Sequence, residues 1–433
     1  MKKAAFHTLG CKVNTYETEV MKSQLKEHGY EIVPFHEAAD VYIINTCTVT
    51  NIADQKSRQM LHKARKKNPQ AVIAAVGCYA QASKEELERD ETADLIIGNN
   101  QKSRLYELLE EYEAKHSRQE AVCDLKHEKS YESMFLTSTE DRTRAFLKIQ
   151  DGCNQFCSYC KIPYARGRAR SRALEDTIEE IRVLAGQGFK EIVLTGIHLS
   201  SYGRDLNEEK RPLLKEVILL AAEIPGIERI RLGSLEPNVI TEDFIIPLAK
   251  CSKFCPHFHL SLQSGCDETL KRMNRHYTAG EYYDKCELIR RYFEHPAITT
   301  DVIAGFPQET EEEFCETCAF VEKVGFAEMH VFKYSRRKGT KADTMEGQVP
   351  EPVKTERSHK LLEIAARSQQ NYLSWYQNRE VEVLTEDEIQ YEGETWRCGH
   401  TKEYVKCLLK NCGANELKTV TVTGATENHM LLS

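Results

Sequence analysis

Short apolar segments alternate with helical patterns over the first 115 residues of the chain. The runs AAFHTL, VYIINT, AVIAAV and DLIIG predict buried strands, and apolar residues recur with helical spacing between them at about 15–28, 52–67 and 104–114. This alternation is typical of an open, mostly parallel α/β sheet. We therefore predict an N-terminal α/β domain over residues 1–120, followed by a polar linker or hairpin segment at 111–134.

The alternation begins again at about residue 141. The strand-like segments are RAFLKIQ, EIVLTG, RIRLGS, HFHLSLQS, ITTDVIAGFP and MHVFKYS, and a helix-compatible stretch follows each of the first five. This pattern predicts a partial (βα)6 barrel over residues 141–376, with an active site at the carboxyl ends of its strands. A long helical pattern at 353–376 leads out of the barrel. After it, EVEVLTE, YVKCLLK and KTVTVTG predict a small antiparallel β-barrel or sandwich over residues 377–433.

Composition places the chain among ordinary globular proteins. Hydrophobic residues make up 41% and charged residues 29% of its 433 residues, which fits two or three domains. No apolar run approaches the roughly 20 residues of a membrane span, and the N-terminus lacks the apolar core of a signal peptide. We therefore expect a cytoplasmic protein without a membrane partner. The net charge of -8 argues against a chain that binds polyanions over its whole surface, but it leaves room for local basic patches.

Clustered cysteines are the strongest chemical signal. Reducing conditions in the cytoplasm disfavour structural disulfides, so grouped thiols among the 16 cysteines point to metal binding or catalysis. Cys153, Cys157 and Cys160 lie in DGCNQFCSYC, directly after the first strand of the barrel. Three thiolates can hold three irons of a cubic [4Fe-4S] cluster and leave the fourth iron without a protein ligand. A zinc site completed by a distant cysteine or histidine is the competing interpretation.

A second triplet is spread through the N-terminal domain. Cys11, Cys47 and Cys78 each follow a predicted parallel strand. Because the carboxyl ends of parallel strands meet at one edge of a sheet, we expect the three thiols to form a second metal site there. The competing interpretation is three buried core cysteines, since free cysteine is commonly buried.

The C-x-x-x-C-x-x-C spacing resembles that of the radical S-adenosylmethionine enzymes. In that family the open iron chelates S-adenosylmethionine, and reduction of the cluster cleaves this cofactor to a 5′-deoxyadenosyl radical. The resemblance makes Cys153, Cys157 and Cys160 the catalytic cluster ligands. It also implies a cofactor pocket formed by LTGIHLSSYG, LGSLEP, LSLQSG and DVIAGFPQET, with Thr195, Gly196, Ser234, Glu236, Gln263, Ser264, Asp301 and Gly305. Each of these eight, taken singly, is equally compatible with a barrel-layer or turn residue.

Two three-cysteine sites in this order resemble the methylthiotransferases, a branch of the same family. The resemblance covers essentially the whole chain and rests on GCKVN, NTCTVT, VGCYAQ, GCNQFCSYCKIPYARGRARSR and GHTKEYVKC. It implies two [4Fe-4S] clusters, the auxiliary one held by Cys11, Cys47 and Cys78, and a C-terminal TRAM domain. It further implies a methyl group from a second S-adenosylmethionine, an electron donor such as flavodoxin or ferredoxin, and a sulfur donor. The hydrogen replaced in this reaction is not acidic enough for a general base, which is why a cofactor radical is needed.

Basic residues beside the cysteines favour a nucleic-acid substrate. The run KIPYARGRARSR follows the radical loop, and its predicted phosphate contacts are Lys161, Arg166, Arg168, Arg170 and Arg172. A second basic run at 56–67 follows Cys47. Either run alone is compatible with a solvated helix or loop face. The TRAM resemblance implies further RNA contacts from an exposed loop, with a purely structural cap as the alternative; the candidates are Arg397, His400, Lys402 and Tyr404.

The motifs TLGCKVNTYE and NTCTVTNIAD most resemble the branch that acts on N6-threonylcarbamoyladenosine. That branch adds a methylthio group to C2 of this nucleoside at position 37 of tRNA, next to the anticodon. Three alternatives stay open: an isopentenyladenosine-tRNA enzyme, whose first motif usually reads more like GCQMN, an enzyme for a ribosomal-protein aspartate, and a non-catalytic iron–sulfur protein for electron transfer or RNA binding. A simple electron carrier would more naturally have four cysteines for each cluster, so the open positions favour an enzyme.

Overall fold

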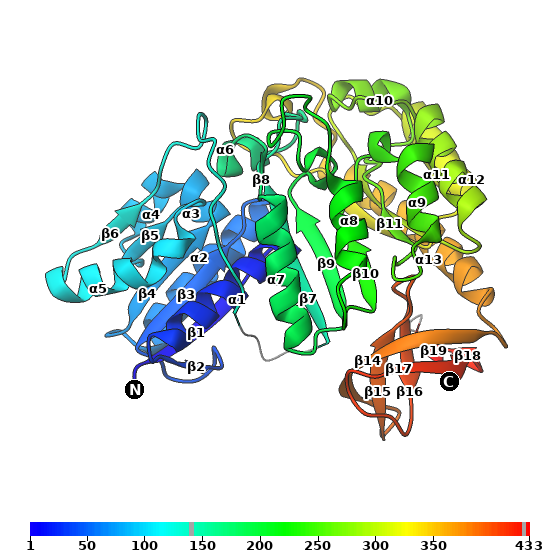
Figure 1. Ribbon diagram of the computed structural model, residues 1–433. Coiled ribbons are helices and arrows are strands. Elements are labelled where there is room, and N and C mark those ends of the chain that lie inside the picture. Colours follow the sequence, from blue (N-terminus) through cyan, green and yellow to red (C-terminus); the bar gives the residue numbers. More distant parts are fainter. Residues whose placement is uncertain (138–142, 427–429) are drawn as a thin grey trace.

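Parallel strands and their crossover helices build the N-terminal region of the computed structural model, which describes residues 1–137, 143–426 and 430–433 (Figure 1). All pairings in its sheet are parallel, in the order β2-β1-β3-β4-β5-β6. The strands are β1 (Lys3–Thr8), β2 (Glu31–Val33), β3 (Val41–Thr46), β4 (Val72–Gly77), β5 (Leu95–Ile97) and β6 (Gln119–Ala121). The helices are α1 (Lys12–Glu27), α2 (Asn51–Lys67), α3 (Cys78–Ala82), α4 (Lys84–Asp90) and α5 (Leu105–Lys115). The predicted open α/β sheet is therefore confirmed.

Six parallel strands form the predicted partial barrel. They are β7 (Arg144–Asp151), β9 (Glu191–Gly196), β10 (Arg229–Leu232), β11 (His257–His259), β12 (Ala297–Ala304) and β13 (Glu328–Lys333). The short strand β8 (Arg170–Ser171) adds to β7 in antiparallel fashion, and isolated bridges such as Leu235 to Leu260 join the two halves of the barrel. Its helices are α6 (Ile162–Arg166), α7 (Leu174–Gly186), α8 (Leu214–Ala222), α9 (Glu242–Lys250), α10 (Asp267–Arg272), α11 (Ala279–Tyr292), α12 (Glu311–Val324) and α13 (Glu351–Ser374). The predicted barrel start at residue 141 lies outside the described residues.

One hydrophobic core joins the N-terminal sheet to the barrel. Helix α1 packs against β7, and buried side chains of both regions, such as Ile43 and Leu147, belong to the same cluster. The segment at 111–134, predicted as a polar linker or hairpin, completes α5, supplies β6 and then buries Leu125 and Met134. The two regions are therefore held as one body.

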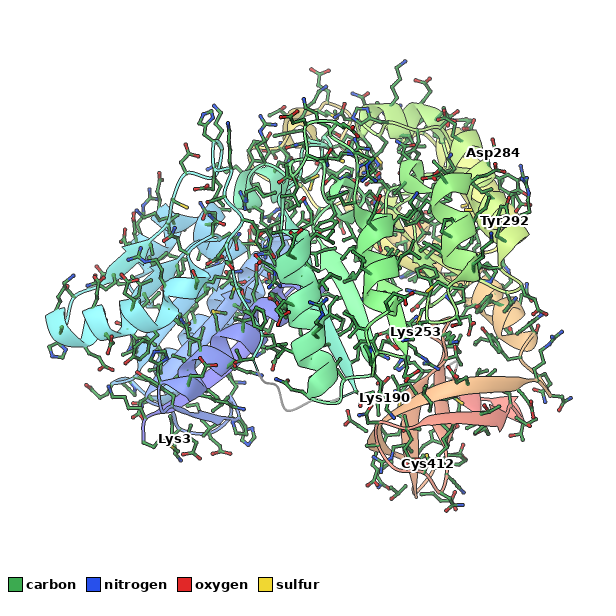
Figure 2. All side chains as sticks on the ribbon, viewed as in Figure 1. Lys3, Lys190, Lys253, Asp284, Tyr292 and Cys412 are labelled. Carbon is green, nitrogen blue, oxygen red and sulfur yellow. The ribbon has the colours of Figure 1, made fainter. Side chains whose placement is uncertain are left out.

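The C-terminal region is a separate β module with its own core. Its strands are β14 (Glu380–Tyr391), β15 (Glu394–His400), β16 (Lys406–Leu409), β17 (Leu417–Thr421), β18 (Gly424–Ala425) and β19 (Leu431–Leu432). It sits at the amino ends of the barrel strands, away from α6 (Figure 1). Lys190 donates to the Asn415 carbonyl oxygen at 2.7 Å across this junction (Figure 2). Among the described residues, no helix is both long and apolar enough to cross a bilayer.

Candidate active site

The loop between β7 and α6 brings Cys153, Cys157 and Cys160 together. All three are free thiols. Burial, together with electrostatic repulsion from the neighbouring Cys157 sulfur, raises the pKa of Cys153 and of Cys160 to about 12. The backbone N–H of Gln155 donates to Cys153 Sγ at 3.4 Å. Three neighbouring thiols at a strand end are the donor set that a [4Fe-4S] cluster takes when one iron stays open, so these residues fit that group.

A segment between α10 and α11 clamps this loop. Asn274 donates to the carbonyl oxygens of Gln155 and Phe156, at 3.1 and 3.2 Å. Arg275 donates from Nη1 to Cys157 Sγ at 3.2 Å and from Nη2 to Glu236 at 2.6 Å. Arg275 could not be predicted as a site residue from local sequence, because its partners lie far away along the chain. The guanidinium ties a cluster sulfur to a predicted cofactor residue.

The second triplet also comes together. Cys11, Cys47 and Cys78 follow the adjacent strands β1, β3 and β4. Burial, together with electrostatic repulsion from Cys78 and Cys11, raises the pKa of Cys47 to about 12. Gly10 has a φ of +100°, and a Cβ there would meet Cys47 Sγ at 3.0 Å. A glycine at position 10 thus permits the close approach, and the three thiols fit a second cluster with one open iron.

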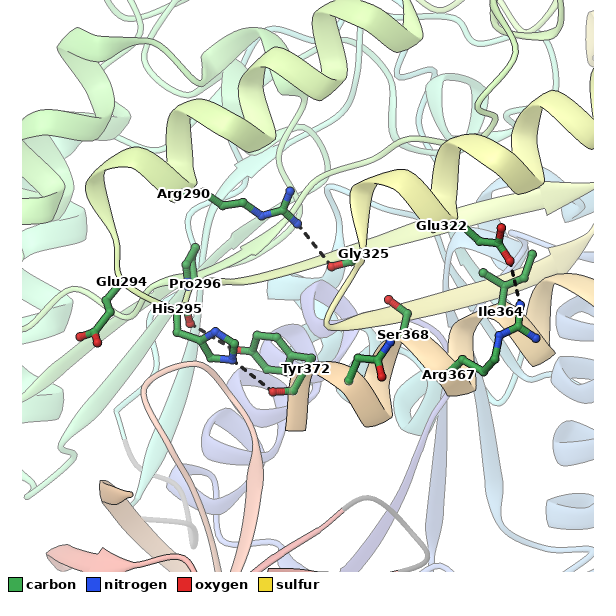
Figure 3. A pocket seen from close by; sticks show the side chains of 11 residues that line it. Arg290, Glu294, His295, Pro296, Glu322, Gly325, Ile364, Arg367, Ser368 and Tyr372 are labelled. Atoms are coloured by element: carbon green, nitrogen blue, oxygen red, sulfur yellow. Dashed lines mark hydrogen bonds and ion pairs between the residues drawn. The ribbon is translucent and has the colours of Figure 1, made fainter. Parts of the chain in front are cut away.

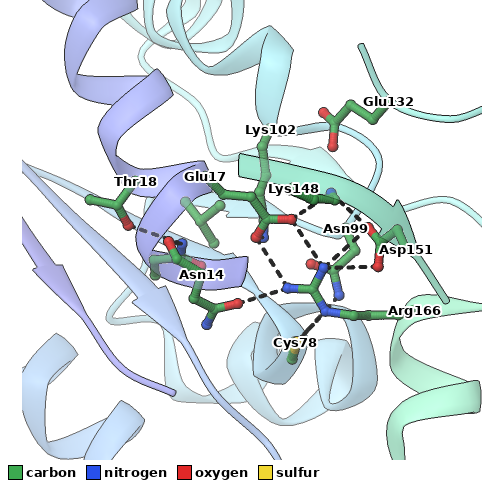
Figure 4. A network of polar contacts seen from close by, with 12 residues as sticks. Asn14, Glu17, Thr18, Cys78, Asn99, Lys102, Glu132, Lys148, Asp151 and Arg166 are labelled. Atoms are coloured by element: carbon green, nitrogen blue, oxygen red, sulfur yellow. Dashed lines mark hydrogen bonds and ion pairs between the residues drawn. The ribbon is translucent and has the colours of Figure 1, made fainter. Parts of the chain in front are cut away.

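A buried polar network around Arg166 joins the second triplet to β7, the strand that leads into the radical loop (Figure 4). Arg166, after the radical loop, donates from Nε to Cys78 Sγ at 3.2 Å and from Nη2 to Asn14 Oδ1 at 2.7 Å. Its Nη1 lies 3.0 Å from a carboxylate oxygen of both Glu17 and Asp151. Although burial opposes it, Arg166 and its neighbouring lysines hold the pKa of Glu17 well below its usual range. These lysines are Lys102 and Lys148.

The basic run after the radical loop does not form the predicted phosphate-binding patch. Arg166, Arg170 and Arg172 are all buried. Arg172 pairs with Glu180, and β8 carries Arg170 into the fold beside β7. The prediction is therefore wrong for these three residues. Of the five predicted phosphate contacts in this run, Arg168 is exposed and Lys161 is half-exposed.

Most of the predicted cofactor residues gather at the carboxyl ends of the barrel strands. Thr195 and Gly196 end β9, and Ser234 and Glu236 follow β10. Gln263 forms a bridge with Val302 of β12. Two others also contact helices. The Ser264 hydroxyl lies 3.1 Å from that of Thr317 in α12, and a Cβ at Gly305 would meet Lys354 Cγ at 2.4 Å, so both positions take part in helix packing, and cofactor contact there stays a prediction.

Asp301 lies within β12, not at its end, between two histidines. Its carboxylate oxygens are 3.3 Å from His259 Nε2 and 3.3 Å from His330 Nδ1. Although burial opposes it, hydrogen bonds with the histidines hold the pKa of Asp301 well below its usual range. Hydrogen bonds with Asp301 and Glu328 raise the pKa of His330 to about 10. This side of the barrel interior is therefore lined with charged groups.

Of the four residues predicted in an exposed loop of the C-terminal module, three lie at its junction with the barrel. Tyr404 stacks on His400, with ring centroids 4.6 Å apart, beneath the guanidinium of Arg231. Lys402 donates to the Ser252 carbonyl oxygen at 2.9 Å, whereas Arg397 pairs with Glu388 inside the module. These contacts favour the alternative of a structural cap, and the RNA contacts stay a prediction.

Two surface hollows differ in their relation to the cysteines. One of about 850 Å³ lies beside the radical loop and is lined by Arg58, Lys161 and Lys338. The other, of about 490 Å³, lies near the amino ends of β12 and β13 around His295 and Tyr372 (Figure 3). In the second hollow the polar groups already bond to one another, as His295 does to the Tyr372 carbonyl oxygen. Only the first hollow adjoins the site.

Comparison with known proteins confirms both resemblances. Residues 3–98 match the uncharacterized protein family UPF0004, and residues 147–321 match the Radical SAM superfamily. The chain is 42% identical to the threonylcarbamoyladenosine tRNA methylthiotransferase MtaB of Bacillus subtilis (strain 168), covering 95% of this chain and 91% of that protein. It is 38% identical to the tRNA-2-methylthio-N(6)-dimethylallyladenosine synthase of Clostridium tetani, covering 88% of this chain and 84% of that protein.

Among solved structures, the radical S-adenosylmethionine methyltransferase TsrM of Kitasatospora setae has the same fold. The TM-score is 0.55 at 14% identity, covering 79% of this chain and 74% of that one. The two domain matches cover the two regions that carry the cysteine triplets. The chain belongs to the MtaB-type methylthiotransferases of the radical S-adenosylmethionine superfamily.

Proposed function

We propose that the chain adds a methylthio group to C2 of N6-threonylcarbamoyladenosine at position 37 of tRNA. The observation that carries the proposal is the pair of three-thiol sites on one body, linked through Arg166. Enzymes of this family use S-adenosylmethionine and [4Fe-4S] clusters. Cys153, Cys157 and Cys160 would hold the radical cluster, and the auxiliary cluster ligands would be Cys11, Cys47 and Cys78. When bound, these groups supply the radical and sulfur chemistry that no side chain can provide.

The chain's own residues position and shield this chemistry. Arg275 keeps a positive charge beside Cys157 Sγ and holds the Glu236 carboxylate in place. Asn274 fixes the loop backbone. The network around Arg166 holds Cys78 against β7 through buried, bonded polar groups.

We propose that the RNA lies over the hollow beside the radical loop. Tyr164 is 53% exposed, and Lys161 Nζ is 5.6 Å from the centre of its ring. Arg168 lies over the Phe156 ring at 4.6 Å. Exposed aromatic and basic side chains together suit base stacking and phosphate contact on a single-stranded loop such as an anticodon loop. Lys338, also exposed, lines the same hollow.

The reaction needs two further partners. An electron donor such as flavodoxin or ferredoxin would reduce the radical cluster, and a sulfur donor would restore the auxiliary site. With tRNA as substrate, these partners place the reaction in the cytoplasm.

Nucleoside mass spectrometry tests the proposal. The protein is reconstituted anaerobically with iron and sulfide and incubated with S-adenosylmethionine, a reductant and tRNA that carries one of the two modified adenosines. We expect a methylthio mass gain on threonylcarbamoyladenosine. A gain on isopentenyladenosine alone would assign the chain to the other tRNA branch. No gain on either, with 5′-deoxyadenosine still formed, would direct the search to the ribosomal protein.

A further inference from the structure

Lys12 extends from the auxiliary cysteine site into the barrel. It directly follows Cys11 and begins α1. Its ammonium lies 5.6 Å from the centre of the Tyr404 ring, over which the guanidinium groups of Arg144 and Arg231 also lie, at 4.9 and 4.6 Å. Since these arginines belong to β7 and β10, Lys12 reaches the interior between the first strands of the barrel.

No carboxylate oxygen of residues 1–137, 143–426 and 430–433 lies within 4.0 Å of the ammonium of Lys12, although Glu191 and Glu328 attract it from a greater distance. The two arginines beside it are each paired with Glu191 at 2.7 Å. A half-buried ammonium without a carboxylate in direct contact is unfavourable, and the positive amino end of α1 adds to the local potential. Lys12 is thus a cation available for an anionic ligand.

The opposite wall of the barrel interior is polar. Strand residues alternate between the core and the interior, so Phe258 is buried in the core while His259 points inward. Asp301 and His330 stand beside His259, and Glu328 lies 3.5 Å from His330 Nε2. A hollow of about 640 Å³ continues below them, where Glu328 and Tyr404 form part of its lining. The side chains of this wall can form hydrogen bonds with the N–H and O–H groups of a ligand. An apolar isopentenyl group buried against the wall would leave these side chains without hydrogen-bond partners.

We propose that Lys12 binds the carboxylate of the threonylcarbamoyl group, with Asp301 and His330 facing the rest of that substituent. The inference rests on the proposed function and names the residue that makes it specific for a carboxylate-bearing adenosine. A side chain next to Cys11 reaches outward from the place where sulfur would be delivered to C2, and the N6 substituent lies close to C2 on the same six-membered ring. Lys12 would act in binding and orientation, not in the chemical step.

A double-mutant cycle between enzyme and substrate tests this pairing. Wild type and Lys12→Met are assayed on anticodon stem-loop RNA that carries the threonylcarbamoyl acid, and on the same RNA with that carboxylate converted to a neutral methyl amide. Because a charge-assisted contact is lost in each case, we expect KM to rise about 10- to 100-fold for the variant with the acid and for wild type with the amide. The variant should show equal KM values for acid and amide. If Lys12→Met distinguishes acid from amide as strongly as wild type does, the pairing is wrong.

Two controls separate the pairing from damage to the neighbouring site. Lys250→Met removes an exposed lysine at the end of α9 and should leave every KM unchanged. Iron and sulfide content and RNA-independent 5′-deoxyadenosine formation should match wild type in Lys12→Met. If the variant loses iron, the wild-type comparison of acid and amide still decides: equal KM values would overturn the inference. Failure of wild type on both threonylcarbamoyl RNAs, with activity on isopentenyl RNA, would overturn the proposed function instead.

Discussion

The Arg166 guanidinium lies 3.2 Å from Cys78 Sγ, although Arg166 ends α6 and Cys78 begins α3, 88 positions earlier in the chain. The same guanidinium holds Asp151, which ends the strand before the radical loop. Arg166 thus couples the position of Cys78 to the strand that leads into the radical loop.

Replacing Arg166 should destabilise the whole body. In Arg166→Met the buried carboxylates of Glu17 and Asp151 lose a counter-ion, so we expect the free energy of unfolding to fall by about 3 kcal/mol or more. Denaturant unfolding of the metal-free protein measures this. Arg168→Met, which removes an exposed arginine two residues later, should change stability by less than about 0.5 kcal/mol. Equal effects of the two substitutions would contradict the structural role of Arg166.

Substitutions in the two triplets should affect different products of the reaction. Cys157→Ala should abolish 5′-deoxyadenosine formation, because an iron of the radical cluster loses its ligand. Cys47→Ala should stop methylthio transfer while retaining cofactor cleavage. Cys315→Ala removes an exposed thiol on α12 and should leave both products unchanged. Normal methylthio transfer by Cys47→Ala would refute the auxiliary assignment.

Arg275 should influence the reduction of the radical cluster. Removing a cation and hydrogen-bond donor beside a cluster sulfur makes electron addition less favourable. For Arg275→Met we expect the midpoint potential to fall by roughly 60 mV, which is a tenfold change for a one-electron couple. Redox titration followed by electron paramagnetic resonance measures it. Arg291→Met, at an exposed position on α11, is the matched control, and equal potentials in the two variants would contradict the prediction.

His330 should give the protein a pH-dependent stability. Its pKa is raised from about 6.5 unfolded to about 10 folded, so its contribution is full below pH 6.5 and is lost as the pH rises toward 10. The side chain is 50% exposed, so solvent screening reduces this contribution to about 1 kcal/mol. Denaturant unfolding of His330→Gln between pH 6 and about 10 should show a flatter profile than wild type. His127→Gln, an exposed control, should retain the wild-type slope.

Tyr164 should contribute to RNA binding without affecting the metal sites. Loss of one stacking platform costs about 1–3 kcal/mol, so Tyr164→Ala should weaken binding of the anticodon stem-loop by about 5- to 100-fold. Fluorescence anisotropy at fixed salt measures this, with iron content as the control for folding. Unchanged affinity would place the RNA elsewhere.

Most strands and both triplets could be predicted from the sequence, because they depend on local pattern. The run VYIINT begins with four apolar residues and forms the fully buried strand β3, and Cys47 follows it directly. The three-residue strands β2 and β6 are too short to show a period. The strand ETWRCGH was missed because it lacks regular alternation of apolar and polar residues.

The sequence did not predict which charged side chains are buried, because their burial depends on partners that are distant in the chain. The arginine-rich run has the composition of an exposed segment. Its local sequence does not show that Arg166 pairs with Glu17 and Arg172 with Glu180 in the interior. Arg275 was missed for the same reason, as Cys157 precedes it by 118 positions. Spacing identifies ligands within one loop, but the groups that position them come from elsewhere in the chain.

The core shared by the N-terminal sheet and the barrel has a thermodynamic consequence. A metal group that binds only the native chain adds its binding free energy to the folding equilibrium. Because α1 and β7 join both triplets to one core, iron bound at either triplet protects the region that carries the other. Iron scarcity would therefore weaken both sites together, and partly loaded molecules would be shorter-lived than fully loaded ones.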